Sequence, residues 1–181
     1  MYMQHYSKLK EKKISTTTLY KGVLGVKLDE VLLPNGHTST RLYFDHRGAS
    51  GVLPVEGEDI YLVEQYRYPV SKTTWEIPAG KREKGQTFLT CARAELQQET
   101  GLRAKTLKEV MMFHPSNAFS NEELHLFVAT GLTRGKDSPD EDEFINLRKF
   151  SFENAYKMVE KGEINDAKTI IMLQWYKLHY K

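Results

Sequence analysis

Three polar side chains near the middle of the chain have a spacing that suits metal-dependent chemistry. Glu95, Gln98 and Glu99 lie in a run of good helix formers without Pro or Gly, 87–100, and Gly101 follows as a helix C-cap would. At about 100° per residue, Glu99 and Gln98 fall roughly 40° and 60° to either side of Glu95. Two carboxylates and an amide on one helix face match the oxygen ligands that Mg²⁺ takes together with water and phosphates.

A solvated helix face is the simpler interpretation of two glutamates that lie four residues apart. Glu95 and Glu99 have no Lys or Arg between them, so the two carboxylates repel one another and need an offsetting positive charge. A bound cation would provide that charge. The spacing alone favours a metal only weakly, and the surrounding sequence has to decide.

That surrounding stretch, residues 80–102, reads GKREKGQTFLTCARAELQQETGL. It resembles the Nudix box, which is a Gly, five residues, a Glu, seven residues and then Arg-Glu-aliphatic-x-Glu-Glu-x-Gly-aliphatic. The resemblance implies a Nudix α/β/α sandwich with a mixed sheet, here with an N-terminal β extension, and a hydrolase that acts on diphosphates. The positions that match are Gly80, Glu95, Leu96, Glu99, Gly101 and Leu102, whereas Gln86, Ala94 and Gln98 stand where the family has Glu, Arg and Glu.

The segment before the box reads WEIPAG, residues 75–80, and resembles the branch of Nudix hydrolases that cleave ADP-ribose and nucleoside diphosphate sugars. In that branch the carbonyl at the position of Ala79 binds metal. The resemblance therefore implies a metal site of Ala79, Glu95, Gln98 and Glu99 that holds Mg²⁺, with Mn²⁺ as the alternative. It also implies that Glu99 takes part in catalysis.

Two other segments are implied to bind substrate. Arg67 follows a strand-like stretch and would face the diphosphate, which suits a guanidinium; an ordinary surface arginine is the alternative. Ser116 and Glu122 lie in PSNAFSNE, where the family has Pro-Ser-Pro-Gly followed by a Glu. Because Asn117 replaces the Pro that marks ADP-ribose enzymes, the sequence predicts the broader nucleotide-sugar class.

An acidic run, DSPDEDE at residues 137–143, follows later in the chain. In the resembling enzymes such a loop delivers a Glu that activates the attacking water. Glu141 matches that residue best and Glu143 second. A solvated acidic turn is the alternative interpretation.

Composition limits the other possibilities. The 181 residues suit one domain, and the resemblance divides it into an N-terminal β region, 1–44, for homodimerisation and a catalytic core, 45–181. A net charge of +2 gives no case for nucleic acid. One cysteine excludes an intrachain disulfide and indicates a reducing compartment, which we take to be the cytoplasm. No apolar run is long enough for a membrane span.

The elements that must position these residues are predicted from composition and turn signals. Strands with one helix between them and two helices at the end suit an α/β sandwich, and the C-terminal sequence from Gly162 resembles bacterial ADP-ribose pyrophosphatases. Strands are predicted at 16–33, 41–44, 49–55, 59–64, 107–112, 123–129 and 147–150, with a turn at 34–36, and helices at 87–100, 152–161 and 166–179, the last two capped by Ser151 and Asn165.

The three altered box positions leave two functions open. Gln86 and Ala94 remove both partners of an ion pair, which costs much less than removing one. Gln98 offers a neutral and poorer ligand, so one metal position should be weakened. The sequence predicts an active or weakly active hydrolase that yields a nucleoside monophosphate and a sugar phosphate. The alternative is a catalytically impaired protein that binds a nucleotide sugar as a sensor.

Overall fold

The computed structural model describes residues 8–135 and 144–180. The chain forms two compact units, Met1–His46 with Ser116–Glu122, and Arg47–Pro115 with Glu123–Lys181. The sequence did not indicate that a segment after the box groups with the N-terminal region. None of the helices in the described residues is long and apolar enough to cross a membrane.

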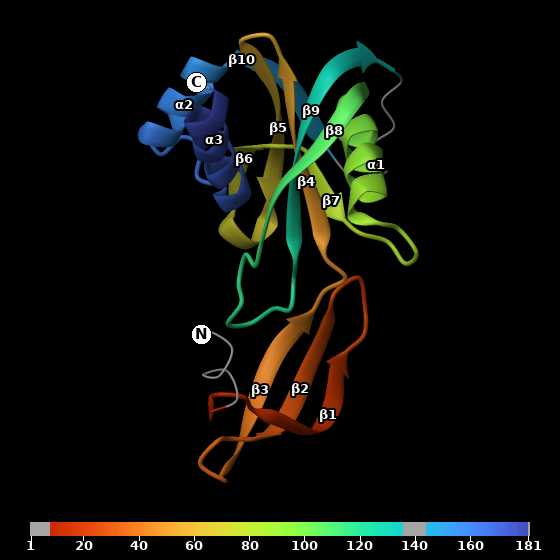
Figure 1. The fold of residues 1–181 in the computed structure, drawn as a ribbon, viewed down its shortest axis with the longest axis vertical. Helices are drawn as coiled ribbons and strands as arrows, with labels where there is room; N and C mark the ends of the chain where they lie inside the picture. Colours follow the sequence, from red (N-terminus) through yellow and green to blue (C-terminus); the bar gives the residue numbers. More distant parts are fainter. Residues whose placement is uncertain (1–7, 136–143, 181) are drawn as a thin grey trace. The chain divides into compact units, whose positions relative to one another are not determined.

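The smaller unit is a three-stranded antiparallel sheet in the order β1-β2-β3 (Figure 1). Its strands are β1 (Lys12–Tyr20), β2 (Gly25–Leu32) and β3 (Thr38–Asp45). The single strand predicted at 16–33 was wrong, because the chain turns between Tyr20 and Gly25 and pairs with itself. The predicted turn at 34–36 is confirmed, since Gly36 adopts a φ of 86° there. Every residue of β1 is exposed.

The larger unit contains a seven-stranded mixed sheet in the order β10-β5-β4-β9-β8, with β6 paired to β5 and β7 paired to β4. Strands β4 and β9 are parallel, and the other pairs are antiparallel. The strands are β4 (Ala49–Glu56), β5 (Asp59–Arg67), β6 (Lys72–Glu76), β7 (Ala79–Lys81), β8 (Leu102–Phe113), β9 (Leu124–Arg134) and β10 (Ile145–Ser151). The sequence missed the two short strands β6 and β7.

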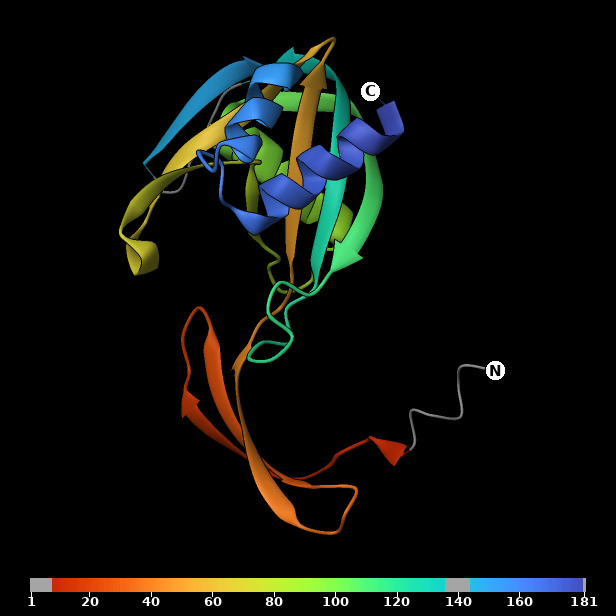
Figure 2. The same ribbon diagram turned by 90° about the vertical axis from the view of Figure 1, so that its left-hand side faces the viewer.

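Helices cover both faces of this sheet (Figures 1 and 2). Helix α1 (Phe88–Thr100) lies on one face, and α2 (Phe152–Glu160) and α3 (Ala167–Tyr180) lie on the other. Because strand side chains alternate, Val52 joins the core under α1 and its neighbour Leu53 joins the core under α2 and α3. This arrangement confirms the predicted α/β sandwich.

The predicted helix starts were half right. Ser151 caps α2, since its side chain accepts a hydrogen bond from the Asn154 amide. At α3 the cap is Asp166 rather than the predicted Asn165, because the Asp166 carboxylate accepts from the Thr169 amide at 3.0 Å. A carboxylate at this position also suits the helix dipole.

Candidate active site

Helix α1 is fixed at both ends, and this sets the rotation of its acidic residues. Thr87 and Thr90 form a reciprocal cap, in which each side-chain oxygen accepts from the other residue's amide at 3.1 and 2.9 Å. Gly101 ends the helix with a φ of 66°. One face is buried against the sheet through Leu96, and Glu95 and Glu99 lie near strand β7.

Glu99 is anchored to the backbone of β7. Its side chain is almost fully buried, with a residue exposure of 7%, and Oε2 accepts a hydrogen bond from the Ala79 amide at 2.9 Å. A buried carboxylate needs such donors or a cation to offset its lost hydration. Glu99 therefore lies beside the residue whose carbonyl is predicted to bind metal.

Glu95 lies against the next residue of the same strand. A Cβ atom built on Gly80 would lie 2.2 to 2.3 Å from the Glu95 carboxyl atoms. Only glycine leaves this space open. The structure thus brings Glu95 and Glu99 together with the Ala79–Gly80 backbone, as the box frame requires, while Gln98 is half-buried on the same helix.

The chemistry of these groups suits a divalent cation. No cluster of three or more His, Cys, Asp or Glu side chains with metal-binding geometry occurs in residues 8–135 and 144–180. Mg²⁺ does not need one, because it commonly binds through one or two carboxylates plus water and substrate phosphates. The buried Glu99, the Glu95 carboxylate seated on Gly80 and a backbone carbonyl fit such an ion.

The loop before α1 closes without the ion pair that the family pattern would place there. The Gln86 side-chain oxygen accepts from the Glu83 amide at 3.0 Å. Arg82 donates from Nη1 to the Gln86 carbonyl at 2.9 Å and from Nε to the Arg47 carbonyl at 3.0 Å. The Arg82 guanidinium also lies 4.6 Å from the centre of the Phe88 ring. The side chains of Arg82 and Gln86 therefore hold this loop, although the family pattern requires neither of them.

The single cysteine is part of the packing. Cys91 lies on the buried face of α1, and its Sγ lies 3.5 Å from the Gly80 carbonyl oxygen. Burial raises the pKa of the Cys91 thiol, and the Glu95 charge raises it further. A neutral buried thiol is a poor nucleophile, so Cys91 serves the packing of the helix against the sheet.

Arg67 at the end of β5 forms a two-bond ion pair with Glu76 at the end of β6. Arg67 Nε donates to Oε1 at 2.8 Å and Nη2 donates to Oε2 at 2.6 Å. Glu76 has an exposure of only 2%. Burial alone would raise the pKa of Glu76, but the hydrogen bonds from Arg67 and the charge of Lys168 outweigh it and lower that pKa to about 2.

Glu76 also receives donors from two further elements. Lys168, in the first turn of α3, donates to Oε2, and Thr74 donates to Oε1. Lys168 pairs in addition with Asp166 at 3.0 Å. Glu76 and Lys168 were missed by the sequence analysis. The signal was present, because a Glu in an apolar strand segment such as WEIPAG needs a cationic partner.

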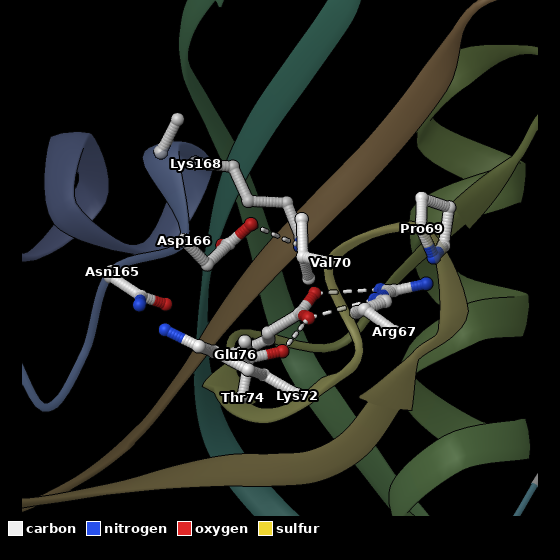
Figure 3. Close-up of a pocket in the computed structure, with 10 residues that line it drawn as sticks. Arg67, Pro69, Val70, Lys72, Thr74, Glu76, Asn165, Asp166 and Lys168 are labelled. Atoms are coloured by element: carbon white, nitrogen blue, oxygen red, sulfur yellow. Dashed lines mark hydrogen bonds and ion pairs between the residues drawn. The ribbon is translucent and has the colours of Figure 1, made fainter.

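A pocket of about 540 Å³ opens beside this network. Figure 3 shows Asp166 and Lys168 on one side of Glu76 and Arg67 on the other. Hydrogen bonding to Glu76 raises the pKa of Arg67, and the charges of Asp166 and Glu99 add to this effect. Arg67 therefore lies within electrostatic reach of both the pocket and the box helix.

The roles of four further predicted site residues are not tested by the geometry of this centre. Ser116 and Glu122 belong to the smaller unit, where the Ser116 carbonyl accepts from the Phe119 amide at 3.0 Å and the Glu122 amide donates to the Ser120 side chain at 3.1 Å. Glu141 and Glu143 lie outside the described residues. The roles of all four stay predictions.

The chain is similar to known proteins over nearly its whole length. A family model of the NUDIX domain matches residues 45–173. The chain is 40% identical over 174 residues to an ADP-ribose pyrophosphatase of Bacillus subtilis (strain 168), with 94% of each protein covered. It is 39% identical over 172 residues to the methanol dehydrogenase activator of Bacillus methanolicus, with 93% of each covered.

The fold is found in a solved structure as well. A crystal structure of an ADP compounds hydrolase aligns with a TM-score of 0.82 and covers 94% of this chain and 96% of that one. The sequence identity is 17%, so this likeness bears on the fold alone. It agrees with the mixed sheet between helices described above.

Proposed function

The chain belongs to the NUDIX domain family, and from this premise we propose that it hydrolyses the diphosphate of ADP-ribose or a related nucleoside diphosphate sugar. It is a pyrophosphohydrolase of the ADP-ribose pyrophosphatase type, like its relatives at 34 to 40% identity. We further propose that Mg²⁺ is the cofactor, with Mn²⁺ as the alternative. The products are a nucleoside monophosphate and a sugar phosphate.

One observation carries this proposal. Two carboxylates of one helix, Glu95 and Glu99, meet the backbone of Ala79 and Gly80, and the charge of Glu99 acts on the Arg67 guanidinium. Carboxylates without a nearby cation would repel a diphosphate, whereas carboxylates that hold a divalent ion next to an arginine attract one. The arrangement supports a site for metal-bound diphosphate.

The divalent ion would be held by Glu95, Glu99 and the Ala79 carbonyl, with Gln98 as a weaker ligand, and would neutralise the phosphate charge and activate a water. Arg67 would donate hydrogen bonds to a phosphate oxygen from the edge of its guanidinium that Glu76 leaves open.

The bond changes follow from the substrate. The water oxygen attacks one phosphorus, the bond from that phosphorus to the bridging oxygen breaks, and the bridging oxygen leaves with the other phosphate. A carboxylate accepts the water proton. For this role we propose Glu141 first and Glu143 second, with Ser116 and Glu122 as further contacts to the substrate.

We also propose that the protein is a cytoplasmic homodimer that needs neither nucleic acid nor a membrane. Strand β1 lies at one edge of the smaller sheet and all of its residues are exposed, among them Ile14 and Leu19. An edge strand of this length offers unpaired backbone groups to a second strand. These features support association through the N-terminal β region.

A specific observation supports a second candidate function, that of a nucleotide-sugar binder with little or no turnover. Gln98 stands where the family has a charged ligand. Helix α1 therefore carries only two acidic side chains, Glu95 and Glu99. One similar protein bears the name methanol dehydrogenase activator, a name that describes an action on another protein. Under this alternative the chain binds the same ligands and releases little or no product.

A hydrolysis panel separates the two functions. ADP-ribose, ADP-glucose, GDP-mannose and UDP-glucose would be incubated with and without Mg²⁺ or Mn²⁺, and nucleoside monophosphate measured by chromatography. We expect metal-dependent release of monophosphate from at least one substrate, and its loss in Glu99→Gln. Binding of these compounds without any release would overturn the enzymatic proposal in favour of the binder.

A further inference from the structure

The Glu76 carboxylate accepts four hydrogen bonds, which occupy all of its acceptor positions. Each oxygen accepts one bond from Arg67, while Thr74 supplies the second donor to Oε1 and Lys168 the second donor to Oε2. A carboxylate has about four lone-pair positions. Glu76 has none left for a metal, so its role lies in what it does to its partners.

The first effect concerns the direction of Arg67. Nε and Nη2 are both held by Glu76, and within residues 8–135 and 144–180 no hydrogen bond engages Nη1. The Arg67 side chain is 41% exposed. The planar guanidinium therefore presents its remaining edge in one fixed direction, which lowers the entropic cost of binding an anion there.

The second effect concerns charge. Arg67 and Lys168 carry two positive charges, and Glu76 and Asp166 carry two negative ones, so the four residues are neutral together. Without Lys168, Arg67 would be a lone cation beside two carboxylates. Its free edge would then lie in a negative field and would attract a diphosphate less.

Helix α3 holds Lys168 in place through its own start. Asp166 accepts from the Thr169 amide and hydroxyl at 3.0 and 2.6 Å, and Thr169 Oγ1 accepts from the Ile77 amide at 2.9 Å. Ile77 directly follows Glu76 in the chain. The first turn of α3 is thus tied to the same segment that carries the Glu76 carboxylate.

We propose that Lys168 is a positioning residue for the reaction: it shares Glu76 with Arg67 and so keeps the free edge of Arg67 oriented and positively charged for the substrate diphosphate. The inference rests on the proposed function, because it assumes that Arg67 faces a diphosphate. Lys168 itself does not need to touch the substrate.

The test is a double-mutant cycle with two readouts. Lys168→Met removes the charge and keeps the apolar stem, Lys168→Arg keeps the charge, and Arg67→Met removes the group that Lys168 is argued to act through. KM and kcat are measured for the best substrate of the panel, and the dissociation constant of ADP is measured by calorimetry. Lys157→Met, an exposed lysine of α2, is the control for a lost charge.

We expect Lys168→Met to raise KM and the ADP dissociation constant by about tenfold, with a smaller change in kcat. Lys168→Arg should retain most of the affinity, and Lys157→Met should match the parent. In the Arg67→Met background, Lys168→Met should have no further effect on affinity.

An equal loss of affinity from Lys168→Met in the presence and absence of Arg67 would overturn the proposal, as would unchanged affinity in a folded Lys168→Met protein. Should Lys168→Met lose its cooperative thermal transition, Lys168→Gln takes its place, because the amide still donates to Glu76 without the charge. A parent that hydrolyses nothing would refute the proposed function alone, since the ADP affinities still report on Lys168.

Discussion

The Glu95 carboxylate occupies the space that a side chain on Gly80 would need, with 2.2 to 2.3 Å between its atoms and a Cβ at position 80. Real atoms do not approach so closely, so either the strand or the carboxylate must move if a methyl group is added. Gly80, the first glycine of the box, is therefore needed because the Glu95 side chain lies against it.

Gly80→Ala should displace Glu95 and lower kcat/KM by roughly 10- to 100-fold, with a stability loss of about 1 to 3 kcal/mol from overpacking. Urea unfolding and steady-state kinetics measure the two effects. The stability loss should shrink in a Glu95→Ala background, where the clash is absent. An additive loss in the double variant would contradict the geometry.

Glu99→Gln should abolish binding of Mg²⁺ or Mn²⁺ in calorimetry. The amide oxygen still accepts from the Ala79 amide, so the fold should survive, whereas the neutral group is a much weaker ligand for a hard cation. Retained binding of the ion in this variant would remove Glu99 from the metal site. The thermal transition serves as the control for folding.

Gln98→Glu should raise both Mg²⁺ affinity and turnover, because it adds a third carboxylate to the helix face. Ala94→Arg alone should not, since Gln86 is neutral and gives the new cation no partner. Gln86→Glu with Ala94→Arg should be roughly neutral in activity, because Arg82 already holds the loop. Measuring kcat/KM over a Mg²⁺ series checks all three. A Gln98→Glu enzyme that is no faster at any Mg²⁺ level would show that position 98 is not limiting.

Glu76 should stabilise the fold in a pH-dependent way. Its pKa is lowered from 4.5 to about 2, so its contribution is complete above pH 4.5 and is lost as the pH falls toward 2. The shift corresponds to roughly 3 kcal/mol. At pH 7, Glu76→Gln should unfold at a lower urea concentration than the parent. The difference between the two urea midpoints should narrow between pH 4.5 and pH 3. A difference that stays constant over this range would argue against the charged network.

Light scattering at micromolar concentrations should give the mass of a dimer. Strand β1 exposes its full length, and charged substitutions in it should therefore favour the monomer. Ile14→Lys is suitable because its side chain is 52% exposed and cannot be needed for the core. A monomer mass for the parent across the concentration range would reject the proposed assembly.

Much of the fold followed from the sequence because its signals were local. Thr87 and Gly101 bracket α1 through their own caps, and the box spacing predicted which carboxylates share a face. Strands β6 and β7 were missed because they are short, and β7 in addition pairs with a strand far from it in the sequence, β4. The partnership of Glu76 with Lys168 depends on residues 92 positions apart, and no local pattern reports such a contact.

Helix α3 is tied to Glu76 through Lys168, so the site depends on the turn that connects α3 to the rest of the chain. The turn at Lys161–Glu163 is exposed, so a protease that cuts there would leave every residue of the box and its metal ligands covalently intact. If the released helix then drifted away, Lys168 would leave Glu76 and Arg67. Loss of α3 would also take the buried Met172 and Leu173 out of the core, so a cut outside the box would cost the protein both stability and the second cation of the Glu76 network.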